Sequence, residues 1–263
     1  MTALAGWRVL VPRGGRWGRE LADRLSALGA APAIVPLIAF EPAEDESALG
    51  AAVARLAEGA YDWLVLTSAT TVDALVRIGA SVPAGTRVAV VGEHTAEAAR
   101  DAGFPVDFLP TGDHSAQGLV AEWPVRPPER AQRVEGRPVE GPERALLPQS
   151  QLADETLLEG LSALGLEVDR VTAYRTVPVE PAAGVAEEVA AGAFAAIVLT
   201  AGSVAARVAD EFAPVPDTTR LVAIGPRTAA EAEAAGLAIA AVAPSRSGAS
   251  IVDALVELAE RQS

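Results

Sequence analysis

Hydroxyl-bearing residues stand directly after several predicted strands, where a helix is predicted to begin. Thr67 and Ser68 follow the strand predicted over 63–66, and Thr200 follows the one predicted over 196–199. Serine and threonine at such positions commonly cap the helix that starts there. In an open α/β sheet, ligands also bind at the carboxyl ends of the strands, where helix N–H groups attract anions. The two roles are compatible, and the sequence leaves both open.

Two further strand ends combine a tight glycine turn, a cation and a hydroxyl. They are Gly92-Glu93-His94-Thr95 and Gly225-Pro226-Arg227-Thr228. A turn followed by a helix cap explains both segments, and a cation at a helix start also favours an anionic ligand. These segments are therefore candidates for binding as well as for capping.

The glycines after the first predicted strand do not form a dinucleotide-binding motif. Gly14, Gly15 and Gly18 are spaced as GGRWG rather than GxGxxG. No acidic residue stands at a strand end about 20 residues further on, where such a motif needs one. We predict a flexible turn before a helix at this point.

The composition excludes several kinds of catalysis and binding. The chain has no cysteine, and all 21 basic residues are arginine, which removes thiolate nucleophiles, disulfides and catalytic lysines. The histidines, His94 and His114, have no acidic cluster at ligand spacing, so we predict no metal site. No GxSxG elbow is present. The net charge of −14 argues against nucleic acid as a partner.

The N-terminus has no basic region that would mark a secretion signal. No stretch approaches the roughly 20 apolar residues of a membrane helix. We therefore expect a cytoplasmic protein without a membrane partner.

Tyrosine is present only at Tyr61 and Tyr174. Tyr61 precedes a predicted strand, and we expect it to pack. Tyr174 lies in an extended segment bounded by proline and is the one hydroxyl suited to act as an acid. Packing as an aromatic filler of a hinge is an equal alternative for Tyr174.

Short apolar runs alternate with alanine-rich helical stretches along the whole chain, which predicts parallel sheets built from βαβ units. At 263 residues the chain suits two domains of ordinary size. The predicted strands cover 8–11, 33–35, 63–66, 87–91, 106–109, 145–147, 167–171, 196–199, 221–224 and 239–242. The predicted helices cover 17–28, 47–58, 70–79, 94–102, 115–122, 154–164, 184–191, 202–211, 227–235 and 248–260.

The sequence repeats with an offset of 132 to 136 residues. Four pairs of segments match in the same order, which indicates an internal duplication. They are RVLVP…LSALG with RALLP…LSALG, WLVLTS with AIVLTA, VAVVGEHTAEAARDAG with LVAIGPRTAAEAEAAG, and SAQGLV with SGASIV.

Two proline-bounded segments follow equivalent units in the two halves, Ile34–Pro42 and Val171–Pro181. We predict that they lie side by side as a two-stranded linker and form a hinge. This division gives a discontinuous first domain over 1–35 plus 179–263, a second domain over 42–170, and linkers at 36–41 and 171–178. Residues 124–143 are rich in proline, arginine and glutamate without apolar periodicity, and are predicted to be a flexible insertion.

Taken together, these segments resemble the uroporphyrinogen-III synthase family. The resemblance rests on RVLVPRGG, DWLVLTSATTV, VAVVGEHTAEAARDAG, the linker VTAYRTVP and AIGPRTAAEAEAAGL, and covers nearly all of the chain except 124–143. It implies two similar α/β domains joined by a two-stranded linker, with the site in the cleft between them.

The resemblance also implies a reaction. Hydroxymethylbilane, a linear tetrapyrrole with eight carboxylates, loses water and closes into uroporphyrinogen III with its last pyrrole ring inverted. No metal or organic cofactor is implied, and the protein is expected to be a monomer. Because the substrate also cyclises unaided to the wrong isomer, the enzyme's task is mainly to hold it in the right geometry.

The residue roles implied by the resemblance follow its motifs. Tyr174 matches the linker tyrosine that assists loss of the hydroxyl. The residues that match positions lining the cleft are Thr67, Ser68, Thr95, Thr200 and Thr228. Cations near strand ends or helix starts are expected to bind the carboxylates, namely Arg13, Arg16, His94, Arg227 and Arg246.

The chain departs from the family at one point. Ala201 stands where many relatives have serine, so we expect Ser203 to cap the following helix or to bind substrate instead. The main alternative to an enzyme is a non-catalytic tetrapyrrole-binding or regulatory module of the same fold. A solute-binding protein would need an export signal, and a methyltransferase or glycosyltransferase would need a glycine-rich nucleotide or methyl-donor loop; neither feature is found.

Overall fold

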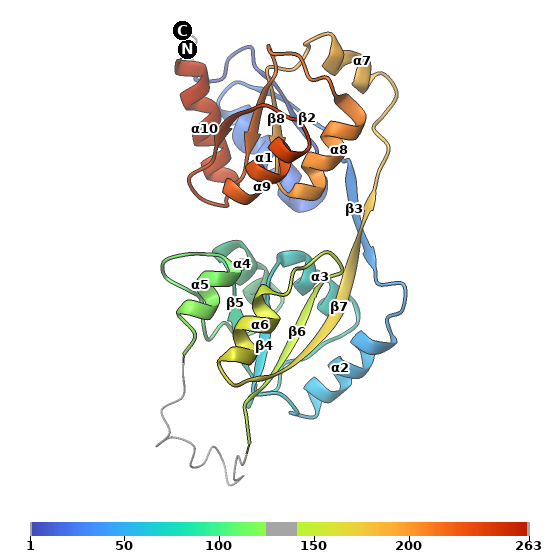
Figure 1. Ribbon diagram of the computed structural model, residues 1–263, viewed down its shortest axis with the longest axis vertical. Helices are drawn as coiled ribbons and strands as arrows, with labels where there is room; N and C mark the ends of the chain where they lie inside the picture. The colour runs from blue at the N-terminus through green and yellow to red at the C-terminus, as the bar shows by residue number, and fades with distance from the viewer. Residues whose placement is uncertain (1, 125–140, 262–263) are drawn as a thin grey trace. The chain divides into compact units, whose positions relative to one another are not determined.

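The computed structural model describes residues 2–124 and 141–261 (Figure 1). The predicted flexibility of the insertion concerns mainly residues outside this range. The chain divides into two compact units, one formed by Met1–Ala39 and Val177–Ser263 and the other by Phe40–Thr176. We call them unit 1 and unit 2.

Unit 1 is built on a five-stranded sheet with the order β10-β9-β8-β1-β2, in which every strand runs parallel to its neighbours. The strands are β1 (Arg8–Val11), β2 (Ala31–Ile34), β8 (Ala196–Leu199), β9 (Arg220–Ala223) and β10 (Ile239–Val242). One face packs on α1 (Gly15–Ala27) and α10 (Gly248–Glu260). The other packs on α7 (Val185–Ala190), α8 (Gly202–Phe212) and α9 (Pro226–Ala234).

Unit 2 is built on a second five-stranded sheet, with the order β3-β7-β6-β4-β5. Its strands are β3 (Ile38–Pro42), β4 (Trp63–Leu66), β5 (Arg87–Val90), β6 (Arg144–Ser150) and β7 (Glu167–Pro178). The pairs β7-β6, β6-β4 and β4-β5 are parallel. One face packs on α2 (Ser47–Ala57), α3 (Ala69–Arg77) and α4 (Glu93–Asp101). The other packs on α5 (Ala116–Ala121) and α6 (Thr156–Ala163).

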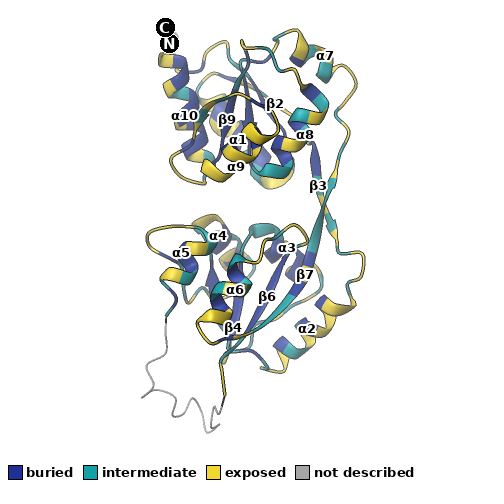
Figure 2. Cartoon of the chain, viewed as in Figure 1, coloured by how far each residue is buried: buried dark blue, intermediate teal, exposed yellow. Residues whose placement is uncertain are grey.

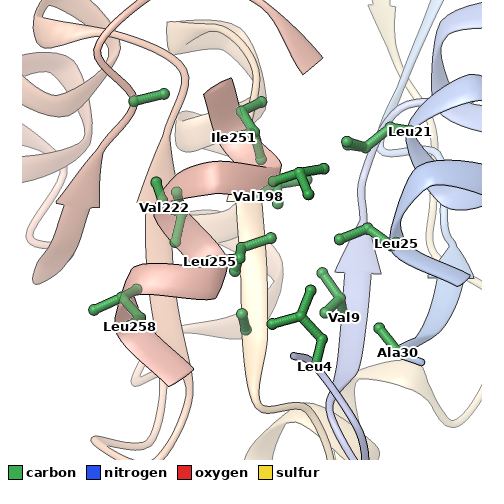
Figure 3. Close-up of a cluster of buried hydrophobic side chains, with 14 of the residues drawn as sticks. Leu4, Val9, Leu21, Leu25, Ala30, Val198, Val222, Ile251, Leu255 and Leu258 are labelled. Atoms are coloured by element: carbon green, nitrogen blue, oxygen red, sulfur yellow. The ribbon is translucent and has the colours of Figure 1, made fainter. Parts of the chain in front are cut away.

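The interior strands are buried along most or all of their length, as expected for parallel strands covered on both faces. Every residue of β4 and of β8 is buried, and the helices in Figure 2 turn their dark faces toward the sheets. Figure 3 shows one face of the unit 1 core, where Val198 of β8 lies among leucines of α1 and α10. In parallel βαβ units each helix runs back against the strands, so its N-terminus lies at the carboxyl edge of the sheet. Both sheets therefore collect loops and helix starts at that edge.

Most of the predicted elements are confirmed, and the α/β class with parallel sheets is confirmed as well. The strand predicted over 106–109 is wrong, because this segment contributes only an isolated bridge between Ala89 and Phe108. The segment predicted as a linker over 171–178 is the continuation of β7. It keeps pairing with β6 as far as Tyr174, which places its first part in the sheet of unit 2. No helix in the described part of the chain is long and apolar enough to span a bilayer.

The duplication is visible in individual contacts as well as in the topology. Thr86 and Thr219 each donate a hydrogen bond to the carbonyl of an aromatic residue 25 positions earlier, at 2.7 and 2.8 Å. Those aromatic residues, Tyr61 and Phe194, each lie under an arginine from the neighbouring strand. Three pairs of glycines at matching helix ends all have positive φ: Gly29 with Gly165, Gly59 with Gly192, and Gly103 with Gly236. The two units thus share caps and buried hydrogen bonds as well as strands.

Candidate functional site

The predicted site residues lie at the carboxyl edges of the two sheets. In unit 2 this edge carries Thr67, Ser68, His94, Thr95 and Tyr174. In unit 1 it carries Arg13, Thr200, Ser203, Arg227 and Thr228.

In unit 2 the structure brings Ser68 and Tyr174 together. Ser68 is the N-cap of α3, and its Oγ accepts a hydrogen bond from the Thr71 N–H at 3.1 Å. The same Oγ lies 3.2 Å from the Tyr174 hydroxyl and 3.0 Å from the Thr71 hydroxyl. The capping role suggested by the sequence for Ser68 is thus confirmed, and the same oxygen also contacts the tyrosine hydroxyl.

Tyr174 is half-buried on the outer part of β7. Its ring packs edge-on against Phe40 of β3, with the ring centres 5.4 Å apart. The next residue, Arg175, forms ion pairs with Glu41 and Glu44 at 2.7 and 3.2 Å. A register shift between β6 and β7 sets Ser150 opposite Tyr174, one residue beyond regular pairing. The tyrosine ring is therefore held on β7 while its hydroxyl points to the start of α3.

The second helix start in unit 2 is that of α4. Gly92 is its N-cap and provides no side-chain bond, so the first N–H groups of α4 have no side-chain acceptor there. Thr95 is buried at 6 % exposure, whereas His94 is exposed. Glu93 of the same first turn is paired with Arg100 at 3.2 Å. Of the two residues predicted here, Thr95 lies in the packed part of the turn.

In unit 1 the equivalent of Ser68 is Ala201, and the helix α8 has no side-chain cap. Ser203 lies inside the first turn, so the expectation that it replaces the missing cap is wrong; a cap must precede the helix to reach its free N–H groups. Thr200 is buried at 7 % exposure, and its hydroxyl has no hydrogen-bond partner among the described residues. A buried hydroxyl without a partner is unfavourable, so Thr200 is the polar group at the carboxyl edge of unit 1 that most needs an explanation.

Three predicted cations of unit 1 make intramolecular contacts, and the first, Arg16, pairs with Glu20 at 2.7 Å. Arg227 pairs with Glu231 at 2.9 Å, and a Cβ on Gly202 would lie 1.7 Å from the second oxygen of Glu231. The carboxylate of Glu231 therefore lies at the start of α8, where the helix dipole favours an anion. Arg13 stacks on Trp17, with its guanidinium carbon 5.2 Å from the ring centre. Thr228 is buried at 4 % exposure in the first turn of α9.

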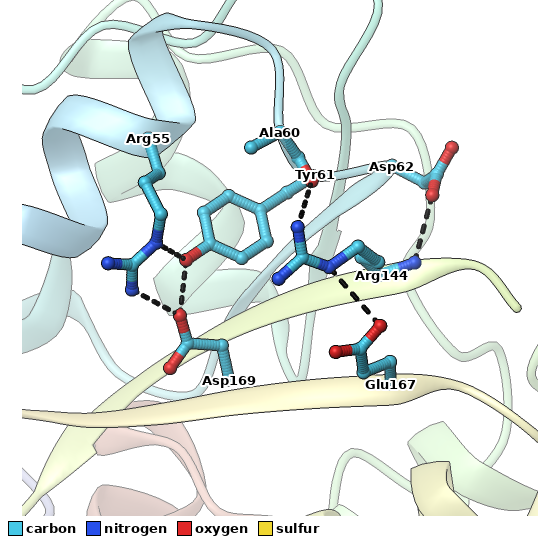
Figure 4. Close-up of polar contacts among 7 residues, drawn as sticks. All are labelled: Arg55, Ala60, Tyr61, Asp62, Arg144, Glu167 and Asp169. Atoms are coloured by element: carbon cyan, nitrogen blue, oxygen red, sulfur yellow. Dashed lines mark hydrogen bonds and ion pairs between the residues drawn. The ribbon is translucent and has the colours of Figure 1, made fainter.

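Tyr61 confirms the prediction that it packs, and it also joins a polar cluster at the opposite edge of the unit 2 sheet (Figure 4). Asp169 accepts hydrogen bonds from the Tyr61 hydroxyl and, at 2.6 Å, from Arg55. Burial, and next the bond to Asp169, raises the pKa of Tyr61. Burial alone would raise the pKa of Asp169, but the bonds from Tyr61 and Arg55 lower it overall. This cluster ties α2 to β7 and lies at the amino ends of the strands, away from the predicted site.

A surface hollow of about 700 Å³ lies in unit 1 between α7 and the segment that follows α8. It contains none of the predicted site residues and opens at the amino end of β9. Its lining combines small apolar and acidic side chains: Ala186, Glu187, Ala190, Glu211, Phe212 and Asp217.

One buried polar residue at the unit 2 edge is not among the site residues predicted from the sequence. Gln149 of β6 is 4 % exposed, and its Oε1 has no hydrogen-bond partner among the described residues. The aligned repeats RVLVPR and RALLPQ place Gln149 at the position of Arg13, which is the signal that was available. No group of three or more potential metal ligands occurs within 2–124 and 141–261.

Comparisons with known proteins agree on one family. The family model described as uroporphyrinogen-III synthase HemD matches residues 19–253. The uroporphyrinogen-III synthase of Synechococcus elongatus is 30 % identical over 181 residues, which cover 66 % of this chain and 62 % of the relative. The porphyrin biosynthesis protein HemD of Ruminiclostridium josui is 28 % identical over 182 residues, which cover 66 % of this chain and 32 % of the relative. The chain thus spans less than two thirds of each of these relatives.

Solved structures support the same fold. A mutant uroporphyrinogen III synthase from the extremely thermophilic bacterium Thermus thermophilus superposes with a TM-score of 0.60 at 18 % identity, covering 98 % of this chain and all of that one. The uroporphyrinogen-III synthetase of Helicobacter pylori superposes with a TM-score of 0.61 at 15 % identity, covering 96 % and 99 %. Because the family model spans most of the chain, the chain belongs to the uroporphyrinogen-III synthase family.

Proposed function

We propose that this chain is a uroporphyrinogen-III synthase, which cyclises hydroxymethylbilane to uroporphyrinogen III with loss of water and inversion of the last ring. The observation that carries the proposal is the contact of 3.2 Å between Ser68 and Tyr174, in a chain of this family. It gives one phenolic hydroxyl a fixed direction at the start of α3, where developing charge can be stabilised.

In this proposal Tyr174 is the catalytic acid for departure of the substrate hydroxyl. The C–O bond breaks, its electron pair leaves with the oxygen, and a proton from Tyr174 completes the water molecule. Ring closure with inversion then forms two carbon–carbon bonds to the last pyrrole, breaks the one that had joined it to its neighbour, and releases one proton, which restores the tyrosine. General acid catalysis of this kind contributes on the order of 10²–10⁴-fold.

Ser68 is a positioning residue for this step. Its Oγ accepts from the Thr71 N–H, which fixes the serine, and the serine in turn fixes the Tyr174 hydroxyl. Tyr174 is further restrained by the edge-on contact with Phe40. A preset hydroxyl supports catalysis because little reorganisation is needed when the bond breaks.

The remaining predicted residues are proposed to bind the eight carboxylates. The starts of α4 and α9 have no side-chain cap and offer N–H groups at the carboxyl edges of the two sheets. Thr95 and Thr228 lie in the first turns of α4 and α9 as equivalent members of the duplication. We also propose that the enzyme acts in the cytoplasm as a monomer and needs no metal or organic cofactor.

A coupled assay with freshly generated hydroxymethylbilane tests the proposal. The products are oxidised and the type I and type III isomers are separated by chromatography. We expect an excess of type III product that increases in proportion to the protein. Type I product alone, formed at the spontaneous rate, would instead support a non-catalytic tetrapyrrole-binding module.

A further inference from the structure

The start of α10 in unit 1 is a helix N-terminus with open donors. Ser247 caps α10 by accepting from the Ser250 N–H at 3.1 Å. The N–H groups of Gly248 and Ala249 lie ahead of the first complete turn and have no intrahelical acceptor. With 13 residues, α10 is long enough for a substantial positive field at this end.

A buried hydroxyl without a partner among the described residues lies on the side of the sheet that α10 covers. Val198, two residues before Thr200, packs between α10 and α1 (Figure 3). Leu199 and Ala201 belong to the cluster on the opposite face. Side chains alternate along an extended chain, so Thr200 points to the α1 and α10 side at the carboxyl end of β8. This is the edge where α10 begins.

Two arginines flank the same helix start. The side chain of Arg246 packs on the backbone of Gly225, since its Cγ is 3.4 Å from where a Cβ would be. In the described part of the chain Arg246 is exposed and has neither an ion pair nor a hydrogen bond. Arg13 stacks on Trp17, whose Cζ2 lies 4.0 Å from the Cβ position of Gly248. Arg246 directly precedes the N-cap Ser247, and Arg13 packs on Trp17, which lies beside Gly248. Both arginines therefore lie near the first turn of α10.

The copy of this arrangement in unit 2 has a different charge. His114 lies beside Gly92 as Arg246 lies beside Gly225, and Gln149 replaces Arg13. Glu122 accepts backbone hydrogen bonds from Thr111 and Gly112 in the loop that carries His114. Those bonds, the Thr111 hydroxyl and the charge of His114 lower the pKa of Glu122.

Unit 2 thus supplies its own carboxylate at this loop, whereas unit 1 has Ala254 at the position of Glu122. The helix in unit 2 is also short, with only six residues in α5. We therefore expect an external anion to bind more tightly at the start of α10 than at the start of α5.

We propose that Arg246, Arg13, the Thr200 hydroxyl and the first N–H groups of α10 form a subsite in unit 1 for one carboxylate of a polycarboxylate ligand. The inference rests on the proposed function only for the identity of that ligand, the linear tetrapyrrole. Because the copy in unit 2 has its own carboxylate at this loop, we assign the subsite to unit 1 alone.

The subsite is tested with uroporphyrin III, a stable octacarboxylate, by titration calorimetry and by amide NMR of the full chain. We expect the Gly248 and Ala249 amide signals to shift on binding. Arg246→Ala is expected to weaken binding about tenfold, the effect of losing a charge-assisted bond. The matched control is Arg261→Ala, which removes the same charge at the other end of α10 and is expected to bind normally.

Thr200→Val is a second test, because it should weaken binding without lowering stability, a result that a merely structural role of Thr200 would not produce. The valine has the same shape and removes a buried hydroxyl without a partner among the described residues, so the free protein should melt at an equal or higher temperature. Binding of uroporphyrin III should nevertheless weaken about threefold, as expected for one neutral hydrogen bond. A variant that binds as tightly as the parent would overturn the role of Thr200.

The outcomes separate this inference from the proposed function. Binding that depends on Arg246 in a chain that makes no type III product would uphold the subsite and refute the synthase activity. Type III synthesis together with unchanged binding by Arg246→Ala and Thr200→Val would refute the subsite alone. A parent protein that fails to bind uroporphyrin III at millimolar concentration would also refute it.

Discussion

Units 1 and 2 are copies of one arrangement, and they differ most at the carboxyl edges of their sheets. In unit 2, Ser68 caps α3 and touches the Tyr174 hydroxyl. In unit 1, Ala201 leaves α8 without a side-chain cap, and the hydroxyl of the preceding Thr200 has no partner among the described residues. The shared contacts, such as those of Thr86 and Thr219, are buried at the amino ends of the strands. The two copies have kept the buried contacts that stabilise the fold, whereas the residues at the carboxyl edges of their sheets differ.

The amino edges of the sheets also differ, but there the difference concerns stability. Tyr61 in unit 2 donates to Asp169, whereas its counterpart Phe194 has no hydroxyl. Unit 1 instead pairs Arg8 with Glu188 at 2.7 Å over the Phe194 ring. Both rings lie under an arginine, but only Tyr61 also anchors a polar cluster through its hydroxyl. Substitutions at the two edges should accordingly affect different measurements.

The largest effect is expected from Tyr174→Phe. Removing the hydroxyl removes the proposed acid but keeps the ring that packs on Phe40. We expect kcat for the type III product to fall about 100-fold, at the lower end for a general acid, with an unchanged melting temperature. Tyr61→Phe is the matched control, because it removes the other tyrosine hydroxyl of the chain and should lower stability with little effect on kcat. Equal kcat values for Tyr174→Phe and the parent would refute the catalytic role.

The second prediction concerns the loop before α5, which is tighter than its copy before α10. A Cβ on Gly118 would lie 1.8 Å from the carbonyl oxygen of Asp113. At the matching position of unit 1, Ser250 fits and bonds to the Ser245 hydroxyl at 2.6 Å. Gly118→Ala should lower the free energy of unfolding by about 1–3 kcal/mol, the usual cost of overpacking.

Urea unfolding followed by circular dichroism measures this change. Gly50→Ala, in the exposed middle of α2 with open space around its Cβ, is the control and should be neutral or stabilising. If Gly118→Ala behaved like Gly50→Ala, the close approach of Asp113 would not constrain the loop.

The third prediction exchanges the caps of the two copies. Ser68→Ala should lower the free energy of unfolding by about 1 kcal/mol, because α3 loses its cap. It should also reduce kcat severalfold, since the Tyr174 hydroxyl loses its contact. Ala201→Ser should do the reverse for α8 and stabilise the protein by up to about 1 kcal/mol.

Stability and turnover measured on both variants test whether the Ser68 contact matters for more than capping. A Ser68→Ala variant with full turnover would show that Ser68 acts only as a helix cap and does not position Tyr174. A turnover change in Ala201→Ser would show that the empty cap in unit 1 has a role of its own.

The sequence predicted the sheets, nearly all helices and the duplication, because apolar periodicity and glycine turns are local signals. It failed at 106–109, where an apolar run adds only one bridge beside β5. It also expected Ser203 to cap α8, since spacing alone does not show which residue precedes the first turn. The bond between Ser68 and Tyr174 joins residues 106 positions apart and depends on the register of β7, which no local pattern contains. Unpartnered groups such as Thr200 and Gln149 likewise become visible only when the surroundings are known.

The smallest effect is expected from Asp169→Asn, in the cluster that unit 1 lacks. The pKa of Asp169 is lowered in the folded protein, so its charge stabilises the fold above the unfolded pKa of about 4. That contribution is lost as the pH falls from about 4 through the lower, folded pKa. At pH 7 we expect Asp169→Asn to cost about 0.5–1 kcal/mol, because the partly exposed pair with Arg55 is screened by water and asparagine can still accept from Tyr61.

The difference between parent and variant should therefore shrink when urea unfolding is repeated between about pH 5 and about pH 3. Asp253→Asn, an exposed carboxylate on α10, serves as the control and should leave this pH dependence unchanged. The bond between Tyr61 and Asp169 belongs to unit 2 alone, because Phe194 stands at the matching position of unit 1. A constant gap between parent and Asp169→Asn across this range would mean that the charge of Asp169 adds nothing to the bond with Tyr61, and that acid does not distinguish the two units at this cluster.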